Sequence, residues 1–146
     1  DKNSCIIKAS TQKANYRTPP DGLMQKIVDA NPDVQFITSA LSDKHPKNNF
    51  EYRHLNRVLT MWDYPIRKLA ALYAIVGRII SVDTGDYHMM LSVGGKADVL
   101  VPESWWAYNH IDFHYSDDCF IDEVPRVRYH RWSQPLANSI CGLNLS

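Results

Sequence analysis

The sequence lacks several features that would assign it to a class at once. It has no stretch of about 18 apolar residues, so we expect no membrane-spanning helix. Its 16 basic and 16 acidic residues cancel, which gives no overall attraction to nucleic acid or to an anionic membrane. It also contains no GxGxxG, GxxxxGK[ST], GxSxG or HExxH motif. Common signatures of nucleotide, hydrolase and zinc-protease chemistry are therefore missing.

Cysteine is scarce as well, with Cys5, Cys119 and Cys141 as the three examples. The absence of a CxxC pair argues against a zinc ribbon or a thioredoxin-like redox site. The chain begins at Asp1 and not at Met, as a mature exported protein does, although a trimmed chain begins in the same way. We expect a secreted or periplasmic protein with a disulfide between Cys119 and Cys141 and with Cys5 free or intermolecular. Other pairings stay open, and in the cytosol all three would be thiols.

The 146 residues and an apolar fraction of 45% are enough for one domain with its own core. The charges are unevenly placed along the chain. Basic residues gather between positions 44 and 68, whereas residues 112–123 carry acidic groups and no Lys or Arg. These two regions either neutralise each other within the fold or form surfaces for different partners.

The first half of the chain has the pattern of a mainly helical region. Residues 1–20 end in paired prolines, which favours an extended N-terminal arm with a short strand at CIIKAS. In residues 21–75, apolar side chains recur at three- and four-residue steps in DGLMQKIVDANP, NFEYRHLNRVLTMW and PIRKLAALYAI, and each pattern predicts a helix. VQFITSALS, in the same region, has the composition of a strand.

Residues 76–146 have the pattern of a mainly β region with a docked C-terminal tail that begins after a short strand at RVRYHRW. In IVGRIISVDTGDYHMMLSVGGKADVLVPE, three β-rich runs are separated by DTGD and VGG. A three-residue loop at positions 93–95 pairs apolar residues with apolar residues and puts Gly95 in the left-handed position. Asp83, Thr84 and Gly85 fit the same loop class. We therefore expect two successive hairpins that form an antiparallel meander.

The expected fold is thus α+β, with N-terminal helices packed on an antiparallel β meander or a small OB-like barrel. VGRIISVDTGDYHMMLSVGGKADVLV resembles the opening meander of OB-type barrels, and in outline that of staphylococcal-nuclease-like domains. The resemblance implies a platform that binds oligonucleotides, oligosaccharides or proteins. After the third strand, VLVPESWW offers only Glu103, which does not match the arginine and carboxylate pattern of the nucleases.

The densest group of chemically versatile side chains is WWAYNHIDFHYSDDC. On a strand its two histidines share a face with an aspartate, which is either a zinc or copper site or the polar side of an edge strand. The adjacent tryptophans would point to opposite faces, so we expect one in the core and the other in a binding patch. The candidate binding residues are Trp105, Trp106, Tyr108, His110, Asp112 and His114.

These observations favour a non-enzymatic extracytoplasmic binding or assembly protein that recognises a protein or glycan, or a second copy of itself, without a cofactor. One alternative is a metal-dependent hydrolase that uses His110, Asp112 and His114 as metal ligands. A second is an OB-type oligonucleotide binder that uses Arg126 and its neighbouring arginines. Nucleic acid is the less favoured partner, because the aromatic residues lie beside the acidic region and not beside the basic one.

Overall fold

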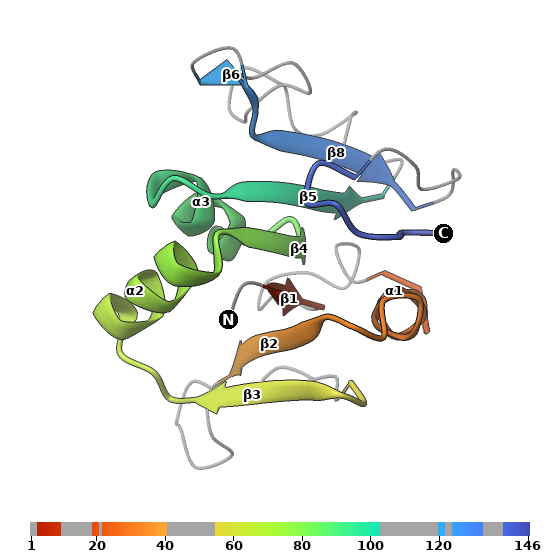
Figure 1. Cartoon of the computed structure of the whole chain (residues 1–146), viewed down its shortest axis with the longest axis horizontal. Helices are drawn as coiled ribbons and strands as arrows, with labels where there is room; N and C mark the ends of the chain where they lie inside the picture. Colours follow the sequence, from red (N-terminus) through yellow and green to blue (C-terminus); the bar gives the residue numbers. More distant parts are fainter. Residues whose placement is uncertain are drawn as a thin grey trace.

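The computed structural model is built on a six-stranded sheet in which each strand is parallel to its neighbours (Figure 1). The structure describes residues 3–9, 19–20, 22–40, 55–102, 120–121, 124–132 and 139–146. The strands of the sheet are β1 (Ser4–Lys8), β2 (Gln35–Ala40), β3 (Val58–Trp62), β4 (Arg78–Val82), β5 (Lys96–Val101) and β8 (Val127–Arg131). Their order across the sheet is β3-β2-β1-β4-β5-β8. A separate antiparallel pair is formed by β6 (Phe120–Ile121) and β7 (Val124–Pro125).

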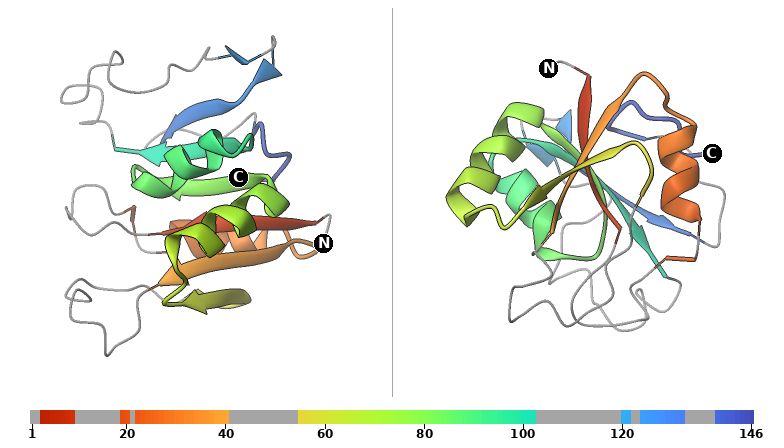
Figure 2. Two further views of the ribbon diagram at one scale, coloured as in Figure 1. Left: turned by 90° about the vertical axis from the view of Figure 1, so that its left-hand side faces the viewer. Right: turned by 90° about the horizontal axis from the view of Figure 1, so that it is seen from below.

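Helices cover both faces of this sheet (Figure 2). The helices are α1 (Leu23–Asp29), α2 (Ile66–Val76) and α3 (Gly85–Ser92). α2 and α3 pack on one face, whereas α1 and the C-terminal segment 139–146 cover the other. Such a sheet, with its order reversing at the middle and helices on both faces, is a doubly wound α/β arrangement. In the described part of the chain, no helix has the length and apolar character needed to cross a membrane.

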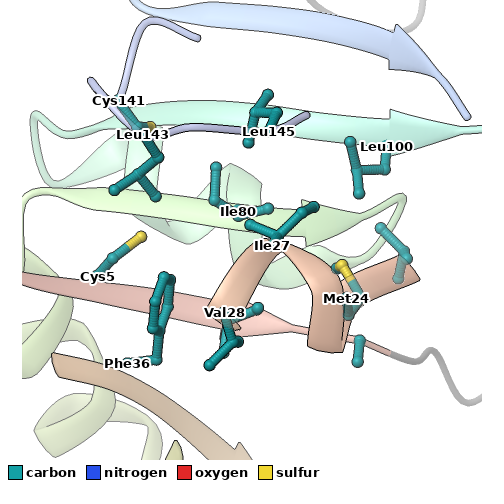
Figure 3. Packing of buried hydrophobic residues seen from close by; sticks show 13 residues of the cluster. Cys5, Met24, Ile27, Val28, Phe36, Ile80, Leu100, Cys141, Leu143 and Leu145 are labelled. Carbon is teal, nitrogen blue, oxygen red and sulfur yellow. The ribbon is translucent and has the colours of Figure 1, made fainter. Parts of the chain in front are cut away.

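The central strands are apolar because they are buried on both faces. Cys5, Ile6 and Ile7 of β1 are fully buried, and so are Ile79 and Ile80 of β4. Alternate residues of each strand contribute to two cores, one under α1 (Figure 3) and one under α2 and α3. Each large aliphatic side chain buried in this way contributes about 1.5–3 kcal/mol. Continuous apolar runs such as these are typical of parallel strands inside an α/β fold.

The expected antiparallel meander or OB-like barrel is wrong, because residues 85–92 form a helix and not a strand. Tyr87, Met90 and Leu91 are its buried side chains, and their spacing is that of one helical face. α3 therefore carries the chain across the sheet, and β4 pairs with β5 in parallel, with no hairpin between them. Gly85 is the first residue of α3 and does not have the positive φ that the hairpin required.

The predicted helix in NFEYRHLNRVLTMW is wrong at its C-terminal end, where β3 forms. Arg57 has a φ of 62°, which no residue of a right-handed helix adopts, and the chain then pairs with β2 as an edge strand. The Arg57 guanidinium instead binds the end of α1 by donating to the Val28 carbonyl oxygen at 2.6 Å. The strands predicted at CIIKAS, VQFITSALS and RVRYHRW and the helices predicted at DGLMQKIVDANP and PIRKLAALYAI are confirmed.

The expected disulfide is not found, because Cys141 is a buried free thiol. Cys5 is also a buried free thiol, and both belong to the core under α1. Burial raises the pKa of Cys5 to about 12 and raises the pKa of Cys141 well above its usual value, so both stay protonated. Cys119 lies outside the described residues.

The C-terminal segment occupies the place of a second helix on the face that α1 covers. Its residues alternate between buried and exposed, with Cys141, Leu143 and Leu145 facing the core. The Asn31 side chain pairs with the Asn144 backbone like a peptide group, donating to its carbonyl oxygen at 2.7 Å and accepting from its N–H at 2.8 Å. The predicted docking of the tail is thus confirmed.

The loop between α3 and β5 contains two adjacent glycines with different constraints. Gly94 has the positive φ, at 92°, whereas Gly95 does not, so the prediction for Gly95 is wrong by one position. A Cβ on Gly95 would lie 2.9 Å from the Gly77 backbone oxygen and would also collide with the Met90 side chain. The Gly77 oxygen accepts a hydrogen bond from the Lys96 N–H at 3.0 Å, so it cannot move freely.

We predict that Gly95→Ala lowers the free energy of unfolding by about 1–3 kcal/mol, because a methyl group there overpacks the α3–β5 loop. Urea denaturation followed by circular dichroism measures this change. Gly85→Ala is the matched control, since its added Cβ meets nothing within 4 Å and its backbone suits any residue. An unchanged midpoint for Gly95→Ala would contradict the close approach to Gly77.

Candidate functional site

The strand order reverses between β1 and β4, which is the position at which open α/β sheets have a crevice at their carboxyl edge. From β1 the chain turns to one face and from β4 it turns to the other, so the two connections separate there. Ligands of open α/β sheets bind outside the carboxyl ends of the strands at such a point. The described residues at this edge include Lys8 at the end of β1 and Asp83 and Thr84 after β4.

The β4–α3 connection is short and opens the start of α3 toward the crevice. Asp83 is buried, with 4% of its surface exposed. Thr84 precedes the helix in an extended conformation (φ −147°, ψ 163°) and makes no side-chain cap. A Cβ on Gly85 would meet nothing within 4 Å, so space remains in front of the helix. The N-terminus of a helix carries a partial positive charge and attracts anions.

Two groups of hydrogen bonds lie on either side of the strand-order reversal. On one side, the Lys8 ammonium donates to the Ser39 carbonyl oxygen at 2.6 Å and approaches the Ser39 hydroxyl at 3.4 Å. On the other side, the Tyr73 hydroxyl donates to Asp86 Oδ1 at 2.6 Å, and the Thr84 hydroxyl donates to Asp86 Oδ2 at 3.2 Å. The first group joins β1 to β2, and the second joins α2 to the start of α3.

Burial keeps the Tyr73 phenol in one protonation state. Tyr73 is fully buried, and burial together with the negative charge of Asp86 raises the pKa of its phenol far above the usual value. Tyr73 is therefore a permanent donor to Asp86 at any pH at which the protein is folded.

α3 is also fixed from its other side. The Tyr87 and Tyr129 hydroxyls lie 3.3 Å apart, and their rings meet edge to face at a centroid distance of 6.1 Å. The His88 ring lies against Tyr87 at 4.0 Å between centroids. Because β8 and the body of α3 are joined in this way, the start of α3 is held in place at the carboxyl edge.

The carboxyl edge thus combines a lysine ammonium and a helix N-terminus. Both groups interact favourably with anionic oxygens, and together they suit a phosphate-containing ligand. The residues Asp83, Thr84 and Gly85 were recognised in the sequence as a turn, but their role at a helix start was missed. The available signal was a polar, glycine-containing turn that directly follows the buried and mainly apolar strand β4.

The side chains predicted to form the binding surface, Trp105, Trp106, Tyr108, His110, Asp112 and His114, lie outside the described residues. Among the residues that the structure does describe, no three His, Cys, Asp or Glu side chains are grouped as a metal site requires. Arg126, proposed for nucleic acid, instead donates to the Gly95 carbonyl oxygen at 3.0 and 3.1 Å. It therefore supports the α3–β5 loop at the opposite edge of the sheet.

A second polar cluster contains the residue types of a hydrolase triad but is arranged as an anchor for the tail. Asp98, which is fully buried, lies 2.7 Å from His130 Nε2 and accepts from the Ser139 hydroxyl at 2.6 Å. The backbone N–H groups of Ile140 and Cys141 also donate to it. Because Ser139 donates to the carboxylate and not to the imidazole, the serine is not activated as a nucleophile.

The same cluster makes tail docking depend on pH. Burial raises the pKa of Asp98, but the hydrogen bonds from His130 and Ser139 outweigh it, and the pKa lies below its usual value. A carboxyl whose pKa is lowered by folding stabilises the native state above its unfolded pKa of about 4. That contribution is lost as the pH falls through the lower, folded pKa.

We predict that Asp98→Ala lowers the free energy of unfolding by about 3–5 kcal/mol, because it leaves His130 and the tail donors without their acceptor. For Asp98→Asn the free energy of unfolding should fall less, and its further decrease below about pH 4 should be smaller than in the wild type. Denaturant melts between neutral and acid pH measure both effects. Asp29→Asn, at an exposed position of α1, is the control. Equal acid sensitivity of wild type and Asp98→Asn would contradict this account.

The fold defines the class of this protein as a doubly wound α/β domain. No protein-family model matches the chain, and no curated protein matches it. Solved structures do. The E. coli heptosyltransferase WaaC with ADP-2-deoxy-2-fluoro heptose has a TM-score of 0.60 at 11% identity, over 88% of this chain and 36% of that one.

Two further solved structures have the same fold. The E. coli ADP-heptose LPS heptosyltransferase II aligns with a TM-score of 0.60 at 12% identity, over 88% of this chain and 38% of its own. WaaC with ADP aligns with a TM-score of 0.54 at 13% identity, over 69% and 34%. At these identities the likeness is one of fold. The chain spans little more than a third of these structures.

These comparisons contradict the functional expectations that rested on an antiparallel sheet. The chain shares its parallel α/β fold with these heptosyltransferase structures, which contradicts the expected non-enzymatic binding protein and the expected OB-type oligonucleotide binder. The metal-dependent hydrolase is contradicted by the same likeness, and its proposed ligands, His110, Asp112 and His114, lie outside the described residues.

Proposed function

We propose that this chain forms the nucleotide-sugar-binding part of a glycosyltransferase. The observation that carries the proposal is the reversal of strand order between β1 and β4, with Lys8 and the start of α3 on either side of it. The similar heptosyltransferase structures, one with ADP and one with an ADP-sugar analogue, support a nucleoside diphosphate sugar as the ligand. In our proposal its diphosphate lies at the carboxyl ends of β1 and β4.

Two groups at this edge suit a diphosphate. The Lys8 ammonium is oriented by its hydrogen bond to the Ser39 carbonyl oxygen, and it carries a positive charge that attracts phosphate oxygens. Gly85 has no side chain to obstruct the approach of phosphate oxygens to the first turn of α3. A charged donor and a helix N-terminus are the groups that α/β folds use for phosphates.

The same groups have a role in sugar transfer. In such a reaction the oxygen of an acceptor hydroxyl forms a bond to the anomeric carbon of the sugar and loses its proton to solvent. The bond from that carbon to the β-phosphate oxygen breaks, and the diphosphate leaves with the electron pair. Negative charge therefore grows on the diphosphate in the transition state. A fixed ammonium and a fixed helix N-terminus stabilise that charge without having to reorganise.

We predict that ADP binds the chain and that Lys8→Met weakens this binding by roughly tenfold, as expected for one charge-assisted hydrogen bond. Isothermal titration calorimetry at low ionic strength measures the two Kd values. Lys96→Met is the matched control, because Lys96 is exposed at the start of β5, on the opposite edge of the sheet. Its Kd should equal that of the wild type.

Two results would contradict the proposal. One is the absence of ADP binding by the wild type and by all variants at millimolar nucleotide. The other is an equal loss for Lys8→Met and Lys96→Met, which would show that only net charge matters and that the carboxyl edge is not the site.

A further inference from the structure

Asp86 places a fixed negative charge at the edge where the proposed diphosphate binds. It lies in the first turn of α3, directly after Gly85. Both of its carboxylate oxygens are engaged, Oδ1 by the Tyr73 hydroxyl and Oδ2 by the Thr84 hydroxyl. The electropositive start of α3 is therefore already neutralised in part by a side chain of the protein itself.

The carboxylate also takes up a donor that a phosphate would use. A threonine hydroxyl has one proton to donate, and that of Thr84 is donated to Asp86. Toward a ligand Thr84 then offers lone pairs, which suit a hydroxyl group and not a phosphate oxygen.

Tyr73 prevents the carboxylate from turning away. Its hydroxyl is fully buried and gives Asp86 the shorter of the two hydrogen bonds, at 2.6 Å against 3.2 Å. Moving the carboxylate would deprive a buried donor of its charged acceptor, which is costly in the interior of a protein. An anion at this edge therefore meets Asp86 as a competitor in a fixed position.

We propose that Asp86 is a specificity-determining residue of the anion site: held by Tyr73, it weakens the binding of free nucleoside diphosphate, and its neutralisation strengthens that binding. The inference rests on the proposed function, because it assigns the effect of Asp86 to a phosphate ligand at this edge. It adds that the negative charge of Asp86 repels the negative charge of the ligand near α3.

The test compares ADP binding by wild type, Asp86→Asn and Asp33→Asn in calorimetric titrations at low ionic strength. Asp86→Asn keeps an acceptor for Tyr73 and removes the charge. We expect its Kd to fall by roughly fivefold to tenfold, the scale for removing one charge near a phosphate at a partly exposed site. The gain should shrink in salt, which screens such interactions. Asp33→Asn makes the same change in net charge near the amino end of β2 and should leave the Kd unchanged.

Tyr73→Phe separates removal of the charge from loosening of the network. It leaves the carboxylate charged and removes its buried donor, so ADP binding should not become tighter. If Tyr73→Phe tightens ADP binding as much as Asp86→Asn does, the tighter binding comes from loosening of the hydrogen bonds around Asp86 and not from removal of its charge. That result overturns the inference. Thermal melts of each variant verify that the folded protein is being titrated.

The outcomes also distinguish this inference from the proposed function. Binding by the wild type with an unchanged or higher Kd for Asp86→Asn would overturn the role of Asp86 and leave the proposed function standing. Binding by Asp86→Asn that is tighter than that of the wild type, or detectable only in the variant, supports both. No binding by any variant would overturn both.

Discussion

The structure depends on the parallel pairing of β1 with two strands at once. β1 hydrogen-bonds to β2 on one side and to β4 on the other, and its Cys5, Ile6 and Ile7 are inaccessible to solvent on both faces. β2 follows β1 through α1, whereas β4 follows only after β3 and α2. The consequence is that helices cover opposite faces and that the two connections separate at the carboxyl edge. The core and the candidate site therefore have the same origin.

Much of the local structure could be predicted from the sequence, because the patterns concerned are unambiguous at short range. α2 begins after Pro65 and ends at Gly77, which has a φ of 78°, and both are ordinary helix boundary residues. α3 is the exception. In DYHMMLS, Tyr87 and Leu91 fit a strand face as well as they fit a helical face, and the burial of Met90 is what distinguishes the two. The ambiguity of this one segment led to the expectation of a meander in place of a parallel sheet.

The global error followed from that local one, since strand direction is set by what connects the strands. A two- or three-residue loop makes neighbours antiparallel, and a crossover helix makes them parallel. Val99 and Leu100 are apolar on adjacent positions because both faces of β5 are covered, which is a property of parallel sheets. The candidate site was missed for the same reason. Thr84 and Asp86 acquire a role only when a helix starts between them.

Asp98 and Asp86 show how differently the fold treats two carboxylates on neighbouring elements. Asp98 faces the α1 side, where three backbone or hydroxyl donors and His130 surround it, and it is fully consumed in holding the tail. Asp86 lies on the other side in the first turn of a helix, where Tyr73 and Thr84 donate to it. The Asp98 carboxylate is enclosed by its own hydrogen-bond donors, so its charge does not act on a ligand at the carboxyl edge. The Asp86 carboxylate keeps lone pairs and a charge directed toward the helix N-terminus, and for that reason it can act on a ligand while Asp98 acts on stability alone.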